Sequence, residues 1–516
     1  MDSLKIWDRM NIRQKYAFIS TFIFGLAAHG MMLFNKYCFH DDLRYIFTGA
    51  PSFPLGRWML YVLGKTEKNI HQYNVYSIPV FNGFFTFLCI AAALCLLIDL
   101  FEIRSKHFCI LLSGIMVTIP VITCMFGYMF AAHYYAFSIL LAVFGSWLIL
   151  KKDRWYHILI AIVILACSVG VYQAYIPTIL SVLLFGLFKM FTEAETIELR
   201  KHALKKTAVI LISCIAFFAL YVGILILCLH LTGLELSGYL GINTARQISL
   251  SIYFKRVLTA YREFFFLSKI SYFNVFPGFA YILYRIMVLL FMGMLAYQAF
   301  CALKKSRING AFLLLFTLLA PLCINFIFVM VKVSGIYAMT SFSYTILFVV
   351  FVFLAEKMIG NEKSRFARLS AAALKVVLGL MVIIFFRYDN ACYVRLEFSM
   401  TQAIRYYSTL VTRIQSVPGY RQDMRVVYIG QNLWSVRDTT LAEESEFDKF
   451  INTHPYWGLR SFMGNSEKLF MEIWFDFKPR EGDKAYFENL PEVMEMPHYP
   501  DDGSVKVVED TVVVKY

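Results

Sequence analysis

Long apolar segments recur along almost the whole of this 516-residue chain and constrain its fold more than any other feature. A hydrocarbon core about 30 Å thick needs roughly 20 apolar residues per helix. Eleven segments approach or reach that length, namely Tyr16–Phe34, Tyr76–Phe101, Phe108–Met125, His133–Leu150, Tyr156–Tyr172, Ile176–Phe191, Thr207–Leu231, Gly278–Leu303, Gly310–Val331, Met339–Lys357 and Ala371–Phe386. Only 16% of the residues are charged, against about a quarter in soluble domains. The chain is therefore predicted to be a polytopic all-α membrane protein.

The loops between these segments alternate in their content of lysine and arginine. Basic residues precede the first segment and follow the second, fourth, sixth, eighth and tenth, as in Lys151-Lys152-Asp153-Arg154 and Lys304-Lys305-Ser306-Arg307. Cytoplasmic loops carry such an excess, which predicts a cytoplasmic N-terminus and, with eleven spans, an exterior C-terminus. The same placement explains the net charge of +14 without a nucleic-acid partner.

The long loops and the polar C-terminal quarter divide the chain. Residues 1–387 are predicted to form a transmembrane domain with two long exterior loops, 35–75 and 232–277, each carrying an amphipathic helical pattern suited to the membrane interface. Beyond them the sequence predicts a helix over Tyr393–Gln415, a strand over Arg425–Ile429 and a hairpin within Gly503–Tyr516. Residues 388–516 are thus expected to form a small extracytoplasmic α+β domain.

The cysteines and histidines give no sign of a metal site. The eleven cysteines and ten histidines show neither a Cys-x-x-Cys pair nor a His-x-x-x-His pair, so no metal is expected. Cys38 and Cys392 are the two cysteines in predicted exterior parts, and a disulfide between them stays open.

Ionisable side chains gather in the first exterior loop, directly after the first span: His40, Asp41, Asp42, Arg44 and Arg57. Charges at the rim of a membrane are costly unless they have partners or a function. One carboxylate could act as general base on an acceptor hydroxyl. The other could pair with Arg44 or Arg57, or cap the helix predicted to begin near Leu43. Asp42 lies closer to that helix start, which slightly favours Asp41 as the base.

A carboxylate on one side and cations on the other are what inverting glycosyl transfer requires. The acceptor oxygen attacks the anomeric carbon while a phosphate leaves, and cations stabilise the departing phosphate. The predicted exterior cations are Arg57, Arg246, Lys255, Arg256 and Arg262. For Lys255, Arg256 and Arg262, snorkelling toward lipid headgroups is the alternative interpretation. Because nucleotides are not supplied outside the cell, the donor is expected to be lipid-linked.

Four groups of short motifs carry a resemblance to a known family. They are His40-Asp41-Asp42 with Gly56-Arg57, Gly170-Val171-Tyr172-Gln173-Ala174, Arg387-Tyr388-Asp389-Asn390, and Met496–Ser504 before Val512–Tyr516. In order and spacing they resemble the serotype-converting type II Gtr glucosyltransferases, bacterial integral membrane enzymes with a GT-C-like architecture. The resemblance covers essentially the whole chain.

The resemblance implies a polyprenyl-phosphate-sugar-dependent hexosyltransferase in the bacterial cytoplasmic membrane. Such an enzyme moves a sugar, often glucose, from undecaprenyl phosphate to an extracytoplasmic glycan such as O-antigen or a cell-wall polymer. The first-loop acidic pair would be the catalytic element. A synthase of the polyprenyl-phosphate sugar and a small flippase would be partner proteins. His40 departs from the small polar residue or asparagine that is more usual there, which leaves the donor sugar open.

Tyr172 and Gln173 lie at the predicted exterior end of the fifth span. The glutamine amide could bind a sugar hydroxyl, or it could serve only to turn a tight hairpin. The sequence does not decide between these two roles.

Three rival functions are weighed against glycosyl transfer. A flippase or transporter predicts ionisable residues near the middle of the bilayer, and the spans are nearly free of them. A lipid-linked glycan polymerase or ligase would depend on arginines rather than on an acidic pair. A non-enzymatic scaffold predicts that Asp41→Asn and Asp42→Asn leave activity intact.

Overall fold

A computed structural model describes residues 4–37, 41–49, 52–238, 249–267, 275–331, 336–360, 365–432 and 466–516. These residues fall into two compact units. The first unit contains the described residues up to Asn35 and those from Ile46 to Ala391. The second contains Lys36–Tyr45 together with the described residues from Cys392 onward. The first-loop segment with the acidic pair therefore groups with the C-terminal residues, whereas the sequence prediction divided the chain once, after residue 387.

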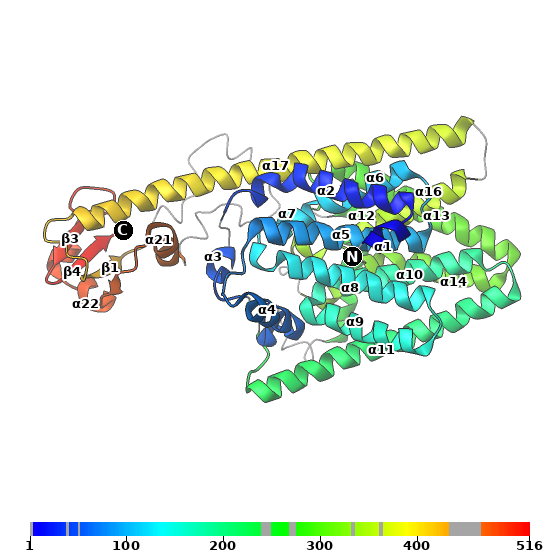
Figure 1. Ribbon diagram of the computed structural model, residues 1–516, viewed down its shortest axis with the longest axis horizontal. Coiled ribbons are helices and arrows are strands. Elements are labelled where there is room, and N and C mark those ends of the chain that lie inside the picture. Colours follow the sequence, from blue (N-terminus) through cyan, green and yellow to red (C-terminus); the bar gives the residue numbers. More distant parts are fainter. Residues whose placement is uncertain are drawn as a thin grey trace. The chain divides into compact units, whose positions relative to one another are not determined.

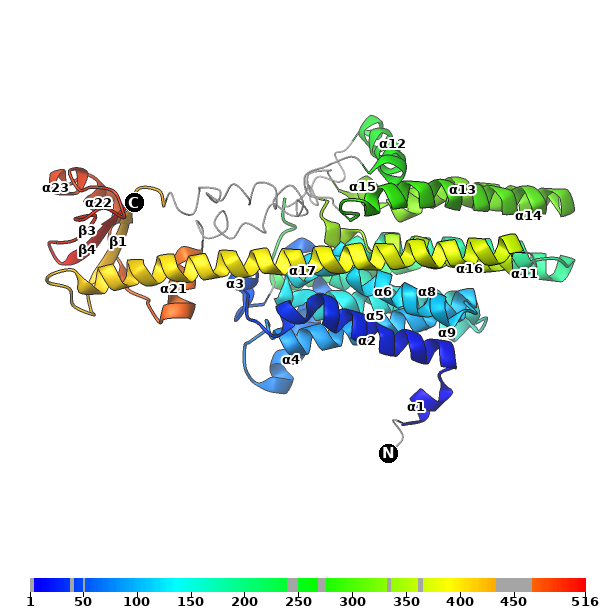
Figure 2. The ribbon, with the colours of Figure 1, turned by 90° about the horizontal axis from the view of Figure 1, so that it is seen from above.

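The first unit is a bundle of helices that run side by side (Figures 1 and 2). Its helices are α1 (Leu4–Arg9), α2 (Ile12–Leu33), α4 (Trp58–His71), α5 (Pro79–Phe101), α6 (Lys106–Thr118), α7 (Pro120–Phe126), α8 (Met129–Lys151), α9 (Trp155–Val171), α10 (Ile176–Glu193), α11 (Ile197–Thr232), α12 (Leu250–Phe266), α13 (Ala280–Lys305), α14 (Arg307–Ile324), α15 (Ile327–Met330), α16 (Tyr344–Ile359) and the first part of α17 (Arg365–Ser416). Each predicted span coincides with helix over most of its length. The helical class is therefore confirmed.

Not every helix in the described part of the chain has membrane-spanning length. Eight helices are long and apolar enough to cross a membrane, or nine when α6 and α7 count as one bent span. These two helices meet at 40°, because Pro120 follows Ile119, whose ψ of 136° is the extended conformation that a following proline favours. Helices α9 and α16 are shorter, with 17 and 16 residues. The count of eleven spans and their sidedness remain predictions.

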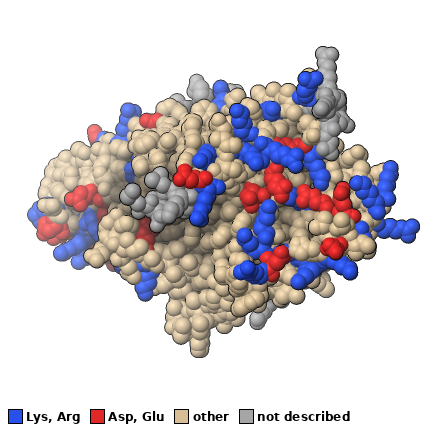
Figure 3. All heavy atoms as spheres, turned by 45° about the vertical axis from the view of Figure 1, so that its right-hand side comes forward, with Lys and Arg blue, Asp and Glu red and all other residues tan. Residues whose placement is uncertain are grey.

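The loops predicted to be cytoplasmic are joined by ion pairs. Lys189 Nζ lies 2.8 Å from Glu102 Oε1, and Lys206 Nζ lies 2.9 Å from Asp153 Oδ1. The carboxylate of Glu356 accepts the backbone N–H groups of Arg104 and Ser105, at 2.7 and 2.8 Å. Figure 3 shows acidic and basic side chains gathered on the end of the molecule that comes forward in that view. The alternation of basic loops in the sequence thus corresponds to contacts among them in the fold.

The second unit contains a four-stranded sheet in the order β2-β1-β4-β3. Strand β1 (Arg425–Ile429) pairs in parallel with β2 (Arg480–Glu481) and with β4 (Thr511–Lys515), while β3 (Val505–Val508) and β4 form an antiparallel hairpin. The short helices α3 (Asp41–Tyr45), α21 (Glu467–Phe475), α22 (Lys484–Glu488) and α23 (Pro491–Met494) complete the described part. The predicted strand and the predicted hairpin are both confirmed, and so is the small α+β character.

The helix predicted over Tyr393–Gln415 and the helical span predicted over Ala371–Phe386 are both confirmed as helix. They are parts of a single 52-residue helix, α17. The polarity of the sequence changes at Arg387, but no proline interrupts the backbone there. The side-chain amide of Asn390 donates to Phe386 O, four residues earlier in the helix, at 3.0 Å. A change from apolar to polar residues therefore marks a change of surroundings rather than the end of the helix.

A partly buried carboxyl group of the second unit is surrounded by donors. Glu467 Oε2 lies 2.9 Å from Asn432 Nδ2, 3.4 Å from the Tyr407 hydroxyl and 3.3 Å from the Tyr516 hydroxyl. Burial raises the pKa of Glu467 above its usual value, although these three hydrogen bonds oppose the shift. The fold therefore favours the protonated form of this side chain.

This raised pKa predicts how the stability of the second unit depends on pH. A carboxyl whose pKa rises on folding stabilises the fold below its unfolded pKa, about 4.3, and loses that contribution as the pH rises through the folded pKa. We expect Glu467→Gln to raise the melting temperature at pH 7 and to flatten its pH dependence. Thermal unfolding of the full chain between pH 4 and 8 measures this, with the exposed Glu495→Gln as the matched control. If the melting temperature of Glu467→Gln varied with pH as in the wild type, a stabilising role for the raised pKa of Glu467 would be contradicted.

Candidate functional site

The two carboxylates of the predicted catalytic pair have different surroundings. Both lie in the first turn of α3, where Asp42 is fully buried and Asp41 is partly exposed. The Lys36 ammonium donates to Asp42 Oδ2 at 2.7 Å. A buried carboxylate is stable in this form only when it is paired. Asp42 is thus buried and paired, whereas Asp41 is partly exposed.

The segment around the pair is packed within the second unit. Leu43 is 3% exposed, and α3 lies beside α21. Tyr37 is also buried, which together with the nearby Glu397 raises the pKa of its phenol to about 12. Arg44 is exposed. His40 and Cys38 lie outside the described residues, so the predicted role of His40 and the predicted pairing of Cys38 with Cys392 stay predictions.

In the first unit, two sequence motifs about 115 positions apart meet through an arginine and two tyrosines. The guanidinium of Arg57 lies 4.7 Å from the centroid of the Tyr172 ring. Its Nη1 donates to the Tyr135 hydroxyl at 3.4 Å, and the rings of Tyr135 and Tyr172 stack with centroids 4.7 Å apart. An arginine held over an aromatic face contributes about 0.5–2 kcal/mol, more when it is desolvated. We call Arg57, Tyr135 and Tyr172 the arginine–tyrosine cluster.

Gly56 and Gln173 position this cluster. Gly56 has φ +72°, and a Cβ at this position would lie 2.5 Å from Gln173 Nε2 and 2.7 Å from the Tyr221 hydroxyl. Gln173 Nε2 donates to Leu55 O at 2.8 Å and to the Tyr221 hydroxyl at 3.0 Å, and that hydroxyl donates to Gly56 O at 3.0 Å. The amide nitrogen of Gln173 thus holds the first exterior loop. Any contact of Gln173 with a sugar remains a prediction.

Gly170 makes a second close contact between the same two motifs. A Cβ at Gly170 would lie 2.6 Å from Cε2 of Trp58, whose side chain is buried. The motif Gly56-Arg57 and the motif beginning at Gly170 therefore form one packed structure. The sequence identified both motifs, but not their contact.

The predicted cations of α12 are largely engaged within the first unit. Arg256 Nη1 donates to Val329 O at 3.1 Å. Arg262 donates from Nε and Nη2 to Oε1 of Glu263, at 2.9 and 2.7 Å, and Glu263 is fully buried. Lys255 is exposed. Arg246 lies outside the described residues.

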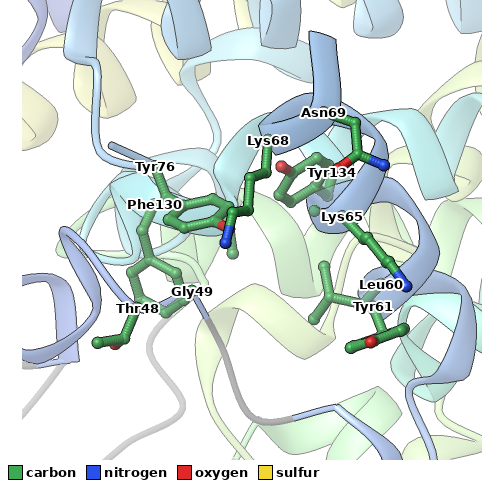
Figure 4. A pocket seen from close by; sticks show the side chains of 12 residues that line it. Thr48, Gly49, Leu60, Tyr61, Lys65, Lys68, Asn69, Tyr76, Phe130 and Tyr134 are labelled. Carbon is green, nitrogen blue, oxygen red and sulfur yellow. The ribbon is translucent and has the colours of Figure 1, made fainter. Parts of the chain in front are cut away.

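A cavity of about 300 Å³, which was not predicted from the sequence, lies between α4 and the start of α8 (Figure 4). Its inner wall is formed by Leu60, Phe130, Ala131 and Tyr134, all buried, and its rim carries Lys65 and Lys68. The sequence does contain an indication of its charged rim. These lysines are three residues apart on an amphipathic helix of the first exterior loop and therefore share a face.

Asp389, in the motif Arg387-Tyr388-Asp389-Asn390, is a fully buried carboxyl group. The Thr123 hydroxyl donates to its Oδ1 at 2.5 Å, and its Oδ2 has no hydrogen-bond partner in the part of the chain that the structure describes. The adjacent Asn390 donates to Ala28 O at 3.3 Å. This motif therefore fastens α17 to α7 and α2.

The motif Met496–Ser504 also has a structural role. Tyr499 N donates to Lys515 O at 2.7 Å, and a ring nitrogen of His498 contacts Tyr516 O. Lys515 N donates in turn to Ser504 O at 2.9 Å. The motif thus holds the end of β4, which explains why it precedes the final valine-rich strand.

No three histidine, cysteine, aspartate or glutamate side chains of the described residues lie close enough together to hold a metal ion. Metal independence stays a prediction that rests on the chemistry of the leaving group.

Comparisons with known proteins connect this geometry to a family. A family model described as "Glucosyl transferase GtrII" matches residues 30–355, well over half of the chain. No curated protein matches the chain. Among solved structures, the chain is similar to the oligosaccharyltransferase of Archaeoglobus fulgidus in complex with Zn and sulfate, with 12% identity and a TM-score of 0.36. That match covers 84% of this chain and 62% of the archaeal chain, and similarity this low carries no conclusion about fold or activity.

Proposed function

The chain belongs to the GtrII glucosyl transferase family, and from that premise we propose that it is a membrane glycosyltransferase with a lipid-linked donor. It moves a sugar, glucose in the first instance, from a polyprenyl phosphate to a glycan outside the cytoplasmic membrane of a bacterium. Its architecture is GT-C-like, with the acidic pair facing the extracytoplasmic side. Family membership, the apolar helices of membrane-spanning length and the acidic pair of α3 support this proposal.

The observation that carries the mechanism is the unequal burial of the two carboxylates. Asp42 is buried and paired with Lys36, while Asp41 in the same turn is partly exposed. Asp41 accepts the proton of the acceptor hydroxyl as that oxygen attacks the anomeric carbon. The bond from the anomeric carbon to the phosphate oxygen breaks, and its electron pair leaves with the lipid phosphate. The configuration of the sugar is inverted. Asp42 positions the turn through Lys36.

Cations near the leaving phosphate stabilise its developing charge. The candidates predicted for donor phosphate or sugar binding are His40, Arg44, Arg57, Tyr172, Gln173, Arg246, Lys255, Arg256 and Arg262. Among those described, Arg57 and Tyr172 are supported by their mutual contact in the arginine–tyrosine cluster. Lys255 and Arg44 are supported by their exposure. The partners we propose are the polyprenyl-phosphate sugar, an envelope glycan such as O-antigen, a synthase of the donor and a flippase.

The test is sugar transfer by the purified full-length protein. We expect transfer to an envelope glycan from undecaprenyl-phospho-glucose and none from a nucleotide glucose. A chelator such as EDTA is expected to leave the rate within about twofold, because a single phosphate on a lipid does not need the divalent cation that a diphosphate recruits. Transport of a lipid-linked glycan without transfer would identify a flippase. Joining of preassembled glycan chains would identify a polymerase or ligase. Either result would overturn the proposal.

A further inference from the structure

The cavity beside α4 has the features of a binding site for an anionic headgroup. Figure 4 shows Lys68 extended toward Phe130 and Tyr76, and Lys65 directed to the opposite side, near Leu60 and Tyr61. Lys65 Nζ lies 5.8 Å from the centroid of the Tyr61 ring. A volume of about 300 Å³ is at the lower end of the range for small-molecule sites. It suits one sugar-phosphate headgroup rather than a polymer.

Lys65 and Lys68 are not paired with a carboxylate among the described residues. The carboxylate between them in sequence, Glu67, lies on a different face of α4, because residues one or two apart on a helix do not face the same way. The cavity therefore keeps two positive charges on one rim.

Glu67 is hydrogen-bonded to two side chains of α8. Its Oε2 lies 3.1 Å from His133 Nε2, and it also accepts a hydrogen bond from the Tyr134 hydroxyl. Burial opposes the charged form, but these hydrogen bonds hold the pKa of Glu67 below its usual value. The carboxylate is thus ionised and engaged on the α8 side. It anchors α4 to α8, beside the cavity.

The remaining lining suits a sugar on an anchoring phosphate. The inner wall is apolar and aromatic, with Phe130 3% exposed and Tyr134 7% exposed. Tyr76 and Asn69 add an aromatic face and an amide at the rim. Apolar and aromatic walls with a few convergent polar groups are the usual composition of a small-molecule site. Lysine binds phosphate as a point charge.

We propose that this cavity binds the sugar-phosphate headgroup of a lipid-linked donor, with Lys65 and Lys68 on the phosphate and Tyr76 and Asn69 at the sugar. This inference rests on the proposed function, since it names a binding site for its donor. It adds Lys65 and Lys68 of α4, which lie in the first unit, to the candidates for binding the donor phosphate.

The test is direct binding of undecaprenyl phosphate to the full-length protein in nanodiscs, measured by native mass spectrometry. We expect the double variant Lys65→Gln/Lys68→Gln to bind it about tenfold or more weakly, since each hydrogen bond from a charged donor contributes about a factor of ten or more to binding. Binding of undecaprenol, which lacks the phosphate, should not change. Lys201→Gln/Lys205→Gln is the matched control, because these lysines are exposed on α11 and their loss changes the net charge equally.

Three results would overturn the inference. They are unchanged binding in Lys65→Gln/Lys68→Gln, an equal loss in the control, and an equal loss of phosphatidylglycerol binding, which would assign the lysines to ordinary phospholipid headgroups. Inorganic phosphate tests the anion alone, and binding as tight as that of undecaprenyl phosphate would exclude a role for the lipid. Because binding is read without transfer, a protein that binds undecaprenyl phosphate through these lysines but transfers no sugar would refute only the proposed function.

Discussion

Replacing Asp41 with asparagine is expected to lower the rate of sugar transfer by about 10²–10⁴-fold, the contribution of a positioned general base. Asparagine keeps the size of the side chain but cannot accept the acceptor's proton. Because Asp41 is partly exposed, whereas Asp42 is fully buried, we expect Asp41→Asn to lower the melting temperature less than Asp42→Asn does. The loss should appear in kcat, since proton transfer takes place in the transition state.

Asp42→Asn is expected to act differently. The substitution leaves the Lys36 ammonium, 2.7 Å away in the wild type, without its buried counter-charge, and breaking a buried pair is costly. We expect a lower melting temperature together with a smaller loss of activity. Lys36→Met combined with Asp42→Asn should recover part of the stability, because neither charge is then left alone.

Comparing Asp41→Asn with Asp42→Asn shows which of the two carboxylates is the general base. Transfer from undecaprenyl-phospho-glucose is measured alongside thermal unfolding for each protein, with Asp476→Asn as the control. Asp476 is an exposed carboxylate of the same unit with φ +50°, a conformation that asparagine tolerates. Full transfer by both Asp41→Asn and Asp42→Asn would exclude the mechanism. A large loss in Asp42→Asn without loss of stability would exchange the two roles.

Replacing Gly56 with alanine is expected to destabilise the first unit by roughly 2–5 kcal/mol. The left-handed backbone costs a residue with a Cβ about 1–2 kcal/mol. The new methyl group would also displace Gln173 Nε2 and the Tyr221 hydroxyl, only 2.5 and 2.7 Å from the Cβ position. Each hydrogen bond lost there costs about 0.5–1.5 kcal/mol. Because Arg57 follows directly, its contact with Tyr172 should be lost as well.

Gly233 provides the matched control for this substitution. It also has a left-handed backbone, with φ +66°, but nothing lies within 4 Å of the Cβ position. Gly233→Ala therefore measures the backbone cost alone, and the difference between the two variants measures the displaced side chains. Equal changes in melting temperature would show that the contacts of Gln173 and Tyr221 with the first loop contribute nothing.

Local sequence patterns were sufficient to predict the structural features that depend on interactions between neighbouring residues. Apolar segments of sufficient length predicted the helices of the first unit, because a spanning helix satisfies its own backbone hydrogen bonds. Alternating β-branched residues predicted β1 at Arg425–Ile429, and the β3–β4 hairpin fell within the predicted Gly503–Tyr516. The short motifs were also visible as sequences. These features depend on residues within a few positions of one another.

The tertiary structure decided what depends on contacts between distant residues. Gln173 lies 118 positions from Leu55, whose carbonyl its amide binds, so no local pattern could join the two motifs. The cavity beside α4 needs α8, which contributes Phe130, Ala131 and Tyr134 to its lining. The membership of Lys36–Tyr45 in the C-terminal unit likewise arises from packing. The sequence by itself determined the helical membrane class and the presence of the acidic pair. Only the structure distinguished the buried Asp42 from the partly exposed Asp41, because burial is a property of the packed chain.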